Sequence, residues 1–220
     1  MKRILIILAL MLINGHVISQ VKFGVQAGAN FATVIEHFEE SEFESKKMFR
    51  MAPRLGVCAD FELQNWLTLR PGLFYSGKGT AWSGFDMQSG DYIRSILHYV
   101  ELPVNVVFKK GHLEFFGGPY FAVAISGEAK VKIDGDKIST EYSFKNELDT
   151  DDLYGDDNYL KGTDFGFQLG VGYNFDPFII SASCAKGLTN INPDIEGFDM
   201  DDNRISNLII NVSLAYYFGG

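Results

Sequence analysis

Apolar and polar residues alternate with a period of two in eight separate segments of the chain. In residues 164–175, for example, apolar side chains from Phe165 to Phe175 alternate with Gly, Gln and Asn. Successive side chains of a β-strand point to opposite faces, so this period predicts strands with one apolar face. The predicted strands are residues 21–32, 54–63, 67–76, 99–108, 113–126, 164–175, 178–188 and 208–218.

The connections between these segments alternate between short turns and long polar loops. Short turns are expected near residues 64, 110 and 176, and long loops at 33–50, 77–95, 127–160 and 190–203. Transmembrane β-barrels have short periplasmic turns and longer extracellular loops. The sequence therefore predicts an all-β fold, an eight-stranded antiparallel up-and-down transmembrane β-barrel with long acidic extracellular loops.

A soluble β-sandwich would also show alternation, and the second face of each strand distinguishes the two folds. In a sandwich that face meets water and is rich in charged residues and Thr. Here it is rich in Gly, Ala, Ser and Asn, which suits the crowded interior of a narrow barrel. The apolar faces also end in aromatic residues, as at the interfacial girdles of membrane barrels: Trp66, Tyr75, Tyr173, Phe175, Tyr216 and Phe218.

The first 19 residues have the pattern of a cleavable secretory signal. Lys2 and Arg3 precede the apolar run of residues 4–13, and the small residue Ser19 stands before Gln20. The alternative, an anchoring helix, would need about 20 apolar residues. We therefore expect a signal peptide at residues 1–19, export from the cytoplasm, and a single β-barrel domain at residues 20–220.

Composition and charge exclude two further classes of protein. The 220 residues are 46% hydrophobic and 21% charged, which is too apolar for an intrinsically disordered protein. The formal net charge is −9, and loss of Lys2 and Arg3 with the signal makes it −11. An acidic chain of this kind is not expected to bind nucleic acid.

The two cysteines, Cys58 and Cys184, are expected to be free thiols. Each falls in the middle of a predicted strand, and these strands are not neighbours in the predicted order. A disulfide needs Cα atoms within about 7 Å. No CxxC or Cys/His spacing indicates redox or zinc chemistry.

Charged and amide side chains on the second face are expected to fill the interior. An eight-stranded barrel is only wide enough for side chains, and opposite charges pair there because an unpaired buried charge is costly. We predict a structural polar network in the lumen from Lys22, Arg54, Asp60, Glu62, Arg70, Glu101, Glu114, Asp164 and Gln168, and place Lys186 on the same face.

An enzymatic interpretation of these residues is the alternative. Two carboxylates in an environment of low dielectric constant can act as acid and base, but a filled lumen leaves no room for a substrate. His37 and His112 fall in connections and His98 at a strand start, with no serine or cysteine at a nucleophile elbow. We expect surface histidines, no catalytic residues and no cofactor.

The long loops are strongly acidic, and one of them resembles the start of a calcium-binding loop. Asp199, Asp201 and Asn203 match that motif, but Arg204 and Ile210 stand where its Gly and bidentate Glu are required. We therefore expect a solvated anionic rim and no metal site.

Aromatic residues within the acidic loop are candidates for a binding surface. Aromatic side chains are enriched at protein interfaces, and those of this loop are Tyr142, Phe144, Tyr154 and Tyr159. The alternative is that they pack the loop against itself.

Several short motifs occur together along the mature chain. They are residues 22–25 (KFGV) with Gly28 and Asn30, 70–76 (RPGLFYS) with 78–79, 99–103 (YVELP), 118–120 (GPY), 164–166 (DFG) with Gly170, Gly172 and Tyr173, and 187–191 (GLTNI). In this order the chain resembles the PorT-like outer-membrane β-barrel proteins of Gram-negative bacteria. The resemblance implies an eight-stranded barrel in the outer membrane without catalytic residues, and some members are associated with protein secretion. One departure is that Gly219 and Gly220 follow Phe218, where such barrels usually end on an aromatic residue.

Together these observations predict a monomeric, non-enzymatic protein in outer-membrane lipid. Its expected role is structural, or interactive with a protein partner through the extracellular loops, with a secretion accessory role included. Two other functions stay open: a narrow channel or transporter for small or hydrophobic ligands, and a lipid-modifying outer-membrane enzyme.

Overall fold

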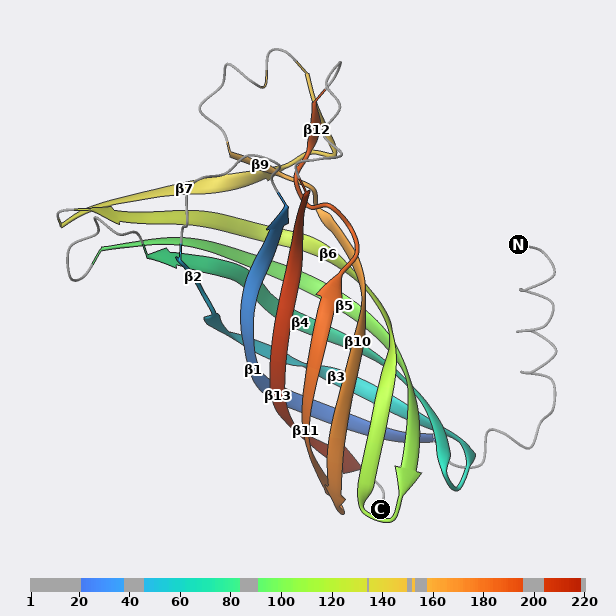
Figure 1. Ribbon diagram of the computed structural model, residues 1–220. Helices are drawn as coiled ribbons and strands as arrows, with labels where there is room; N and C mark the ends of the chain where they lie inside the picture. The colour runs from blue at the N-terminus through green and yellow to red at the C-terminus, as the bar shows by residue number, and fades with distance from the viewer. Residues whose placement is uncertain are drawn as a thin grey trace.

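Eight long strands form a closed antiparallel ring in the computed structural model (Figure 1). The structure describes residues 21–37, 46–83, 91–133, 135–149, 152, 158–195 and 204–218. In ring order the strands are β1 (Val21–His37), β3 (Arg50–Gln64), β4 (Leu67–Ser83), β5 (Tyr92–Lys110), β6 (Leu113–Ile133), β10 (Thr163–Phe175), β11 (Phe178–Gly187) and β13 (Arg204–Phe218). The ring closes because β13 pairs with β1, so the predicted eight-stranded barrel is confirmed.

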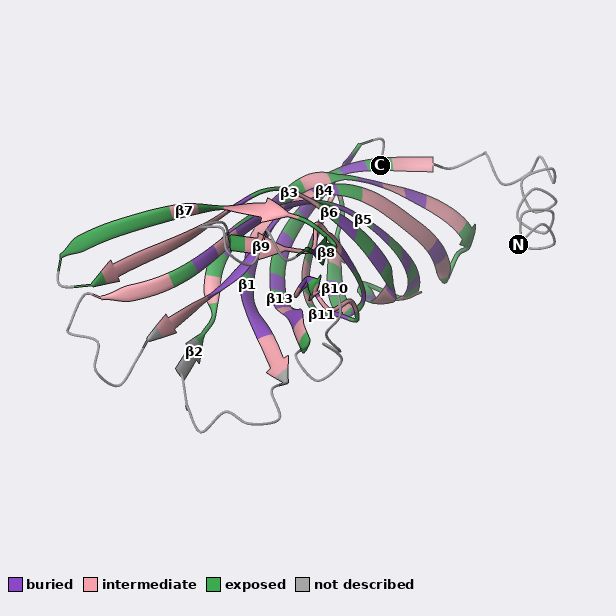
Figure 2. Ribbon diagram, turned by 90° about the horizontal axis from the view of Figure 1, so that it is seen from above, coloured by how far each residue is buried: buried purple, intermediate pink, exposed green. Residues whose placement is uncertain are grey.

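Burial alternates along much of the ring, most regularly on β5, β10 and β13, as the period of two predicts (Figure 2). On β5, Glu101 and Asn105 are buried, whereas Leu102 and Val104 between them are exposed. Polar and small residues thus face the interior, and apolar residues face outward. The interior is tightly filled: a Cβ added to Gly170 would lie 2.4 Å from Cζ of the Phe116 side chain on β6.

The ring strands are joined by short turns at one end. Residues 65–66 connect β3 to β4, residues 111–112 connect β5 to β6, and residues 176–177 connect β10 to β11. Gly111 adopts a φ of 61°, a left-handed conformation that glycine favours. These turns lie where the sequence predicted them.

At the opposite end, three strands continue past the ring. Pairing of β4 with β5 continues to Trp82 and Ile93, and pairing of β5 with β6 continues to Tyr92 and Lys132. The strand β7 (Asp136–Phe144) adds to β6, and β2 (Lys46–Met48) adds to β4. We call residues 77–83, 92–98, 127–133, β2 and β7 the strand extension; Figure 1 shows it leaning to one side of the ring.

The strand extension corrects the prediction of long loops at residues 77–95 and 127–160. Residues 128–133 alternate strictly between charged and apolar side chains, which is a strand pattern. A β-bulge shifts the register where His98 pairs with Ser126 and Tyr99 pairs with Ala124. The extra residue on β6 changes which positions face outward. Odd-numbered residues face outward before the bulge, and even-numbered residues do so after it.

Three short strands lie near the end of the ring from which the extension starts. The strand β9 (Asn158–Leu160) pairs in parallel with β7, and β8 (Glu147–Leu148) pairs in parallel with β12 (Asp194–Ile195). A buried apolar cluster closes the ring below them: Ala32, Val34, Leu97, Tyr99, Tyr120, Ala122, Ala185, Ile191 and Ile209.

Both cysteines are free, as expected: Cys58 is buried on β3 and Cys184 is exposed on β11. Within the described residues, the structure contains no helix of the length and apolarity that a membrane span requires.

Candidate functional site

The barrel interior contains two groups of ion pairs, one nearer the short turns and one nearer the strand extension. We call them the lower and the upper cluster. Both form because alternate residues of the ring strands point inward, and charged residues at these positions meet across the lumen. Ion pairs between strands that are not neighbours in the ring tie opposite walls of the barrel together.

Arg70 of β4 is the centre of the lower cluster. Its Nε donates to Asp60 Oδ1 at 2.6 Å and its Nη1 to Glu114 Oε2 at 2.9 Å. The Tyr217 hydroxyl donates to the same Asp60 carboxylate at 3.0 Å. Lys109 Nζ lies 3.1 Å from Glu62 Oε1 and Lys22 Nζ lies 3.9 Å from it.

Lys78 of β4 is the centre of the upper cluster. Its side chain is 0% exposed, and its Nζ lies 2.9 Å from Glu101 Oε2 and 2.9 Å from Asp164 Oδ2. Arg54 Nη2 donates to the other oxygen of Glu101 at 3.1 Å. Asp164 also accepts hydrogen bonds from the Tyr120 hydroxyl at 3.2 Å and from Asn207 Nδ2 at 2.9 Å.

Aromatic rings lie close to both cations of the upper cluster and to Arg70 of the lower cluster. The Arg54 guanidinium lies 3.8 Å from the centre of the Phe74 ring, and Lys78 Nζ lies 4.4 Å from that of Tyr120. The faces of aromatic rings attract cations. The rings therefore add to the stabilisation that the carboxylates give.

Each cluster is electrically balanced. Arg70, Lys109 and Lys22 face three carboxylates in the lower cluster, and Arg54 and Lys78 face two in the upper cluster. Removing a charge from water costs several kcal/mol unless an opposite charge compensates it. The balance explains how so many ionisable groups are accommodated inside a narrow barrel.

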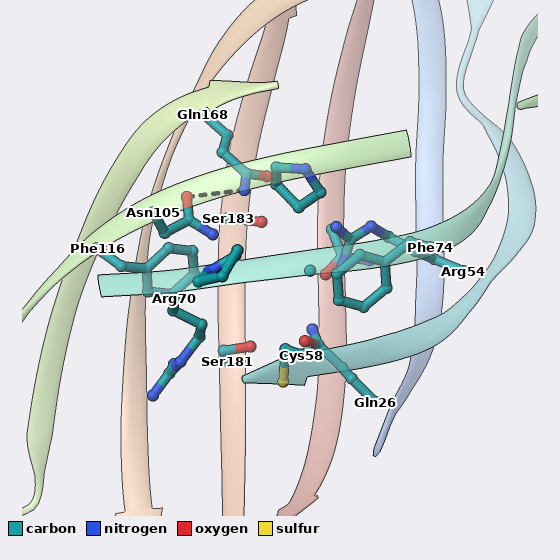
Figure 3. A pocket seen from close by; sticks show the side chains of 14 residues that line it. Gln26, Arg54, Cys58, Arg70, Phe74, Asn105, Phe116, Gln168, Ser181 and Ser183 are labelled. Carbon is teal, nitrogen blue, oxygen red and sulfur yellow. Dashed lines mark hydrogen bonds between the residues drawn. The ribbon is translucent and has the colours of Figure 1, made fainter. Parts of the chain in front are cut away.

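Between the clusters lies a small polar cavity (Figure 3). It has about 30 Å³ of free space, and its lining includes Arg54, Cys58, Arg70, Phe74 and Gln168. Gln168 Nε2 donates to Asn105 Oδ1 at 2.9 Å. One water molecule occupies roughly 10–15 Å³ on this measure, so the cavity has room for about two.

The nine residues predicted for the lumen occupy different depths of the interior. Asp60, Glu62, Arg70, Glu114 and Lys22 belong to the lower cluster, and Arg54, Glu101 and Asp164 to the upper one. Gln168 lines the cavity between them.

Three placements from the sequence are wrong. His37 was expected in a connection but is the last residue of β1. Lys186 is exposed on the outward face of β11, because its neighbours Ala185 and Gly187 point inward. His98 lies inside β5, and its Nδ1 contacts the Tyr75 hydroxyl. It was expected at the start of a strand, but β5 begins at Tyr92 and so includes part of the predicted loop.

Sequence reasoning missed several members of the clusters. Lys78 follows a glycine in a run of small residues that was interpreted as a loop, and Lys109 was assigned to a turn. The signal for Lys78 was its position two residues beyond Ser76, on the inward face of β4. Tyr120, Asn207 and Tyr217 occupy inward positions, but only ring closure brings them to Asp164 and Asp60.

The aromatic residues predicted as a loop surface are divided between β7 and β9. Tyr142 and Phe144 lie on β7 and Tyr159 on β9, all half-buried, and Tyr154 lies outside the described residues. Tyr142 packs against the apolar cluster that closes the ring. Tyr142 thus packs this segment against the barrel, in keeping with the alternative considered for this loop.

The acidic segment next to these aromatic residues is held by local ion pairs. Lys145 Nζ lies 2.5 Å from Asp152 Oδ1, and this hydrogen bond lowers the pKa of Asp152. Lys161 Nζ lies 2.8 Å from Asp194 Oδ1. In the described part of the chain no three His, Cys, Asp or Glu side chains form a group that could hold a metal ion, and Asp199, Asp201 and Asn203 lie outside it.

The outward surface of the ring is apolar and bordered by aromatic residues at the short turns. Trp66 stacks on Phe108, and Phe178 contacts both Phe175 and Tyr216. An apolar band with an aromatic girdle is typical of barrels that span a membrane. A family of outer membrane protein β-barrel domains matches residues 14–192. The chain belongs to this family.

Membership in this family places the barrel in the outer membrane. Periplasmic turns are short in such barrels, so the short turns face the periplasm and the strand extension lies on the extracellular side.

Several solved barrels are similar to the chain. Neisserial surface protein A is 14% identical, with a TM-score of 0.47 over 91% of this chain and 100% of that one. Ail, the attachment invasion locus protein of Yersinia pestis, is 14% identical, with a TM-score of 0.44 over 90% and 99%. A major outer membrane protein from Thermus thermophilus is 16% identical, with a TM-score of 0.46 over 90% and 99%. No curated protein matches the chain by sequence.

Proposed function

We propose that this protein is a non-conducting, non-enzymatic barrel of the outer membrane that presents its extracellular end to a protein partner. The observation that carries this proposal is the upper cluster, where Lys78 links β4 to both β5 and β10 with no solvent exposure. Together with Arg70 in the lower cluster, it fills the lumen with paired charges. A barrel filled in this way acts as a scaffold for what lies outside the membrane.

The same filling argues against transport and catalysis. The cavity between the clusters has about 30 Å³ of free space, whereas ligand pockets usually have about 300–1,000 Å³. Every charged residue of the upper cluster has an opposite charge as its partner. This pairing of the charges supports a barrel that neither conducts ions nor acts as an enzyme.

We extend the proposal to processing, assembly and biological role. Residues 1–19 act as a cleaved signal peptide, residues 20–220 form the barrel domain, and the barrel is a monomer. The PorT-like order of motifs, such as YVELP at residues 99–103, supports an accessory role in protein secretion. The partner then contacts the extracellular end, where Phe144 and Tyr159 are half-buried.

Conductance tests the non-conducting part of the proposal. Purified protein inserted into planar lipid bilayers should give no steady current in monovalent salt. Folding is checked on the same sample by heat-modifiable migration on a gel. A reproducible open channel would replace the proposal with transport.

Crosslinking in intact cells tests the interaction part. A photoreactive residue at Phe144 and one at Tyr159 should each crosslink to the same partner protein. One at Lys110, which is exposed at a periplasmic turn, should not crosslink to that partner. If the adduct proteins belong to the secretion apparatus, the secretion role is supported. Identical adducts from both ends of the barrel, or none at the extracellular end, would contradict it.

A further inference from the structure

The outward face of the strand extension carries a group of cations directly above the apolar band. On β5, even-numbered residues face outward: Val104, Leu102 and Val100 are exposed in the apolar band, and the same row continues through His98 and Ile96 to Arg94. Because no residue is inserted into β5 itself, Arg94 lies on the same face as the residues that contact lipid.

The register of the neighbouring strands brings further cations beside Arg94. Arg94 pairs with Lys130 of β6, and Lys132 of β6 pairs with Lys137 of β7. Residues that are directly opposite in neighbouring strands share a face. Arg94 and Lys137 are exposed, and the Lys130 side chain is 41% exposed. We call Arg94, Lys130, Lys132 and Lys137 the basic patch.

Acidic residues on this face lie one step closer to the ring. Glu128 and Glu141 pair with each other, and Lys130 Nζ lies 2.7 Å from Glu128 Oε1. The patch still has an excess of positive charge. This excess is notable because the whole chain carries a net charge of −9.

The other face of the extension is mainly apolar, and Lys78 on that face is buried in the upper cluster. Leu97 pairs with Gly127 and is 1% exposed, and it belongs to the buried cluster that Trp82 and Tyr142 cover. Val131, between Lys130 and Lys132, faces the same side as Leu97. The four cations of the basic patch therefore lie together on the face that continues the lipid-facing wall.

The end of the patch nearest the ring lies within side-chain reach of the lipid headgroups. A strand that tilts by about 40° gains about 2.5 Å of height per residue. The outward apolar residues of β6 begin at Leu113 and end at Ile125, which spans roughly the 30 Å of a hydrocarbon core. Lys130 is about 12 Å higher, and long cationic side chains reach back toward the interface, where the headgroup layer is about 5–8 Å thick.

We propose that the basic patch binds the phosphate groups of anionic lipid headgroups in the extracellular leaflet. Lys and Arg side chains near a membrane surface attract anionic headgroups, with about 1 kcal/mol for each cation. Bound headgroups hold the extension against the membrane surface, and the apolar face of the extension then points away from the membrane. The phosphate is that of a lipid, because the apolar band directly below the patch contacts the acyl chains.

Titration of the folded protein in neutral detergent micelles tests this proposal. The probes are bisphosphorylated lipid A, its monophosphorylated form, phosphatidylcholine and inorganic phosphate. We expect the affinity to fall in this order, with inorganic phosphate bound at least about tenfold more weakly than bisphosphorylated lipid A. Raising the salt concentration should weaken binding because the attraction is electrostatic.

Substitutions locate the binding on the patch. The triple variant Arg94→Gln, Lys130→Gln and Lys137→Gln should bind bisphosphorylated lipid A at least about tenfold more weakly, since each cation contributes about fivefold. A matched triple variant, Lys110→Gln, Lys145→Gln and Lys161→Gln, loses the same charge elsewhere and should stay within about twofold of wild type. Glu128→Gln removes a competing carboxylate and should strengthen binding.

Two results would overturn the assignment. Heat-modifiable migration first shows that the patch variant is folded. If this variant then binds lipid A as tightly as the matched variant, the patch is not the binding site. If inorganic phosphate binds as tightly as the lipid, then the ligand is a free phosphate rather than a headgroup.

Discussion

The ring and the strand extension share three strands but have opposite arrangements of charge. In the ring, β5 directs Glu101 inward and Val100 outward; a few residues further, it directs Leu97 inward and Arg94 outward. The ring is charged inside and apolar outside because lipid surrounds it. Along β5 the extension shows the reverse order, because water and headgroups surround it; Lys78 of β4 still points inward, into the upper cluster. The change from apolar to charged outward residues along β5 therefore indicates that the membrane boundary lies near His98.

The bulge on β6 lies at this boundary. Below it, the odd-numbered residues Phe121 and Val123 face outward, and above it the even-numbered Glu128 and Lys130 do so. One inserted residue exchanges the two faces of β6 relative to its sequence. The bulge therefore separates the part of β6 whose outward face is apolar and contacts lipid from the part whose outward face is charged and contacts water.

The largest expected effect concerns the charges inside the ring. Lys78→Met leaves Glu101 and Asp164 buried without their shared cation, which should cost about 3–5 kcal/mol of unfolding free energy. Urea unfolding in lipid vesicles measures this. Lys110→Met, exposed at a turn, serves as the control and should change stability by less than about 0.5 kcal/mol. Equal effects of the two variants would show that the upper cluster does not stabilise the ring.

A second effect compares the outward faces of the two regions. Leu169 is 62% exposed on the lipid-facing wall, and Leu169→Arg should cost about 2–4 kcal/mol near the membrane midplane. Ile96→Arg, outward on the extension, should cost less than about 1 kcal/mol. Unfolding in vesicles measures both. Tolerance of Leu169→Arg would mean that this face does not contact lipid.

A smaller effect concerns one hydroxyl of the lower cluster. Tyr217→Phe removes the hydrogen bond to Asp60, and a bond to a charged group contributes about 1.5–3 kcal/mol. Because Arg70 continues to pair with Asp60, we expect the lower end of this range. Tyr173→Phe, an outward-facing ring near the turns, is the control. If Tyr217→Phe lowers the free energy of unfolding as much as Lys78→Met does, then the hydroxyl, rather than the ion pair with Arg70, holds Asp60 in place.

Much of the ring could be predicted from the sequence, because strict alternation identifies strands and assigns each residue to a face. Arg54, Arg70 and Glu101 were placed on the inward face for this reason. Their partners could not be predicted, since which residues meet across the lumen depends on the stagger of the closed ring. The contact of Lys78 with Asp164, for example, joins strands that are far apart in sequence and not adjacent in the ring.

The strand extension was missed because small and charged residues are also typical of loops. Gly77, Gly79 and Thr80 suggested a loop after β4, and the acidic composition of residues 127–160 hid the alternation of residues 128–133. The bulge added to this, because it shifts the phase of β6 relative to the strand below. Attention to phase changes, rather than to composition, would have extended the strands.

The most direct test of this inversion is an accessibility scan along β5. Spin labels are introduced one at a time at residues 94 to 105, with Cys58 and Cys184 replaced by Ala, and the protein is folded into vesicles. Labels at Val100, Leu102 and Val104 should be accessible to molecular oxygen from the lipid, and a label at Arg94 to a water-soluble paramagnetic complex, with the change near His98. Labels at Glu101 and Asn105 should be shielded from both. Uniform accessibility along the outward row, without a change near His98, would contradict the account.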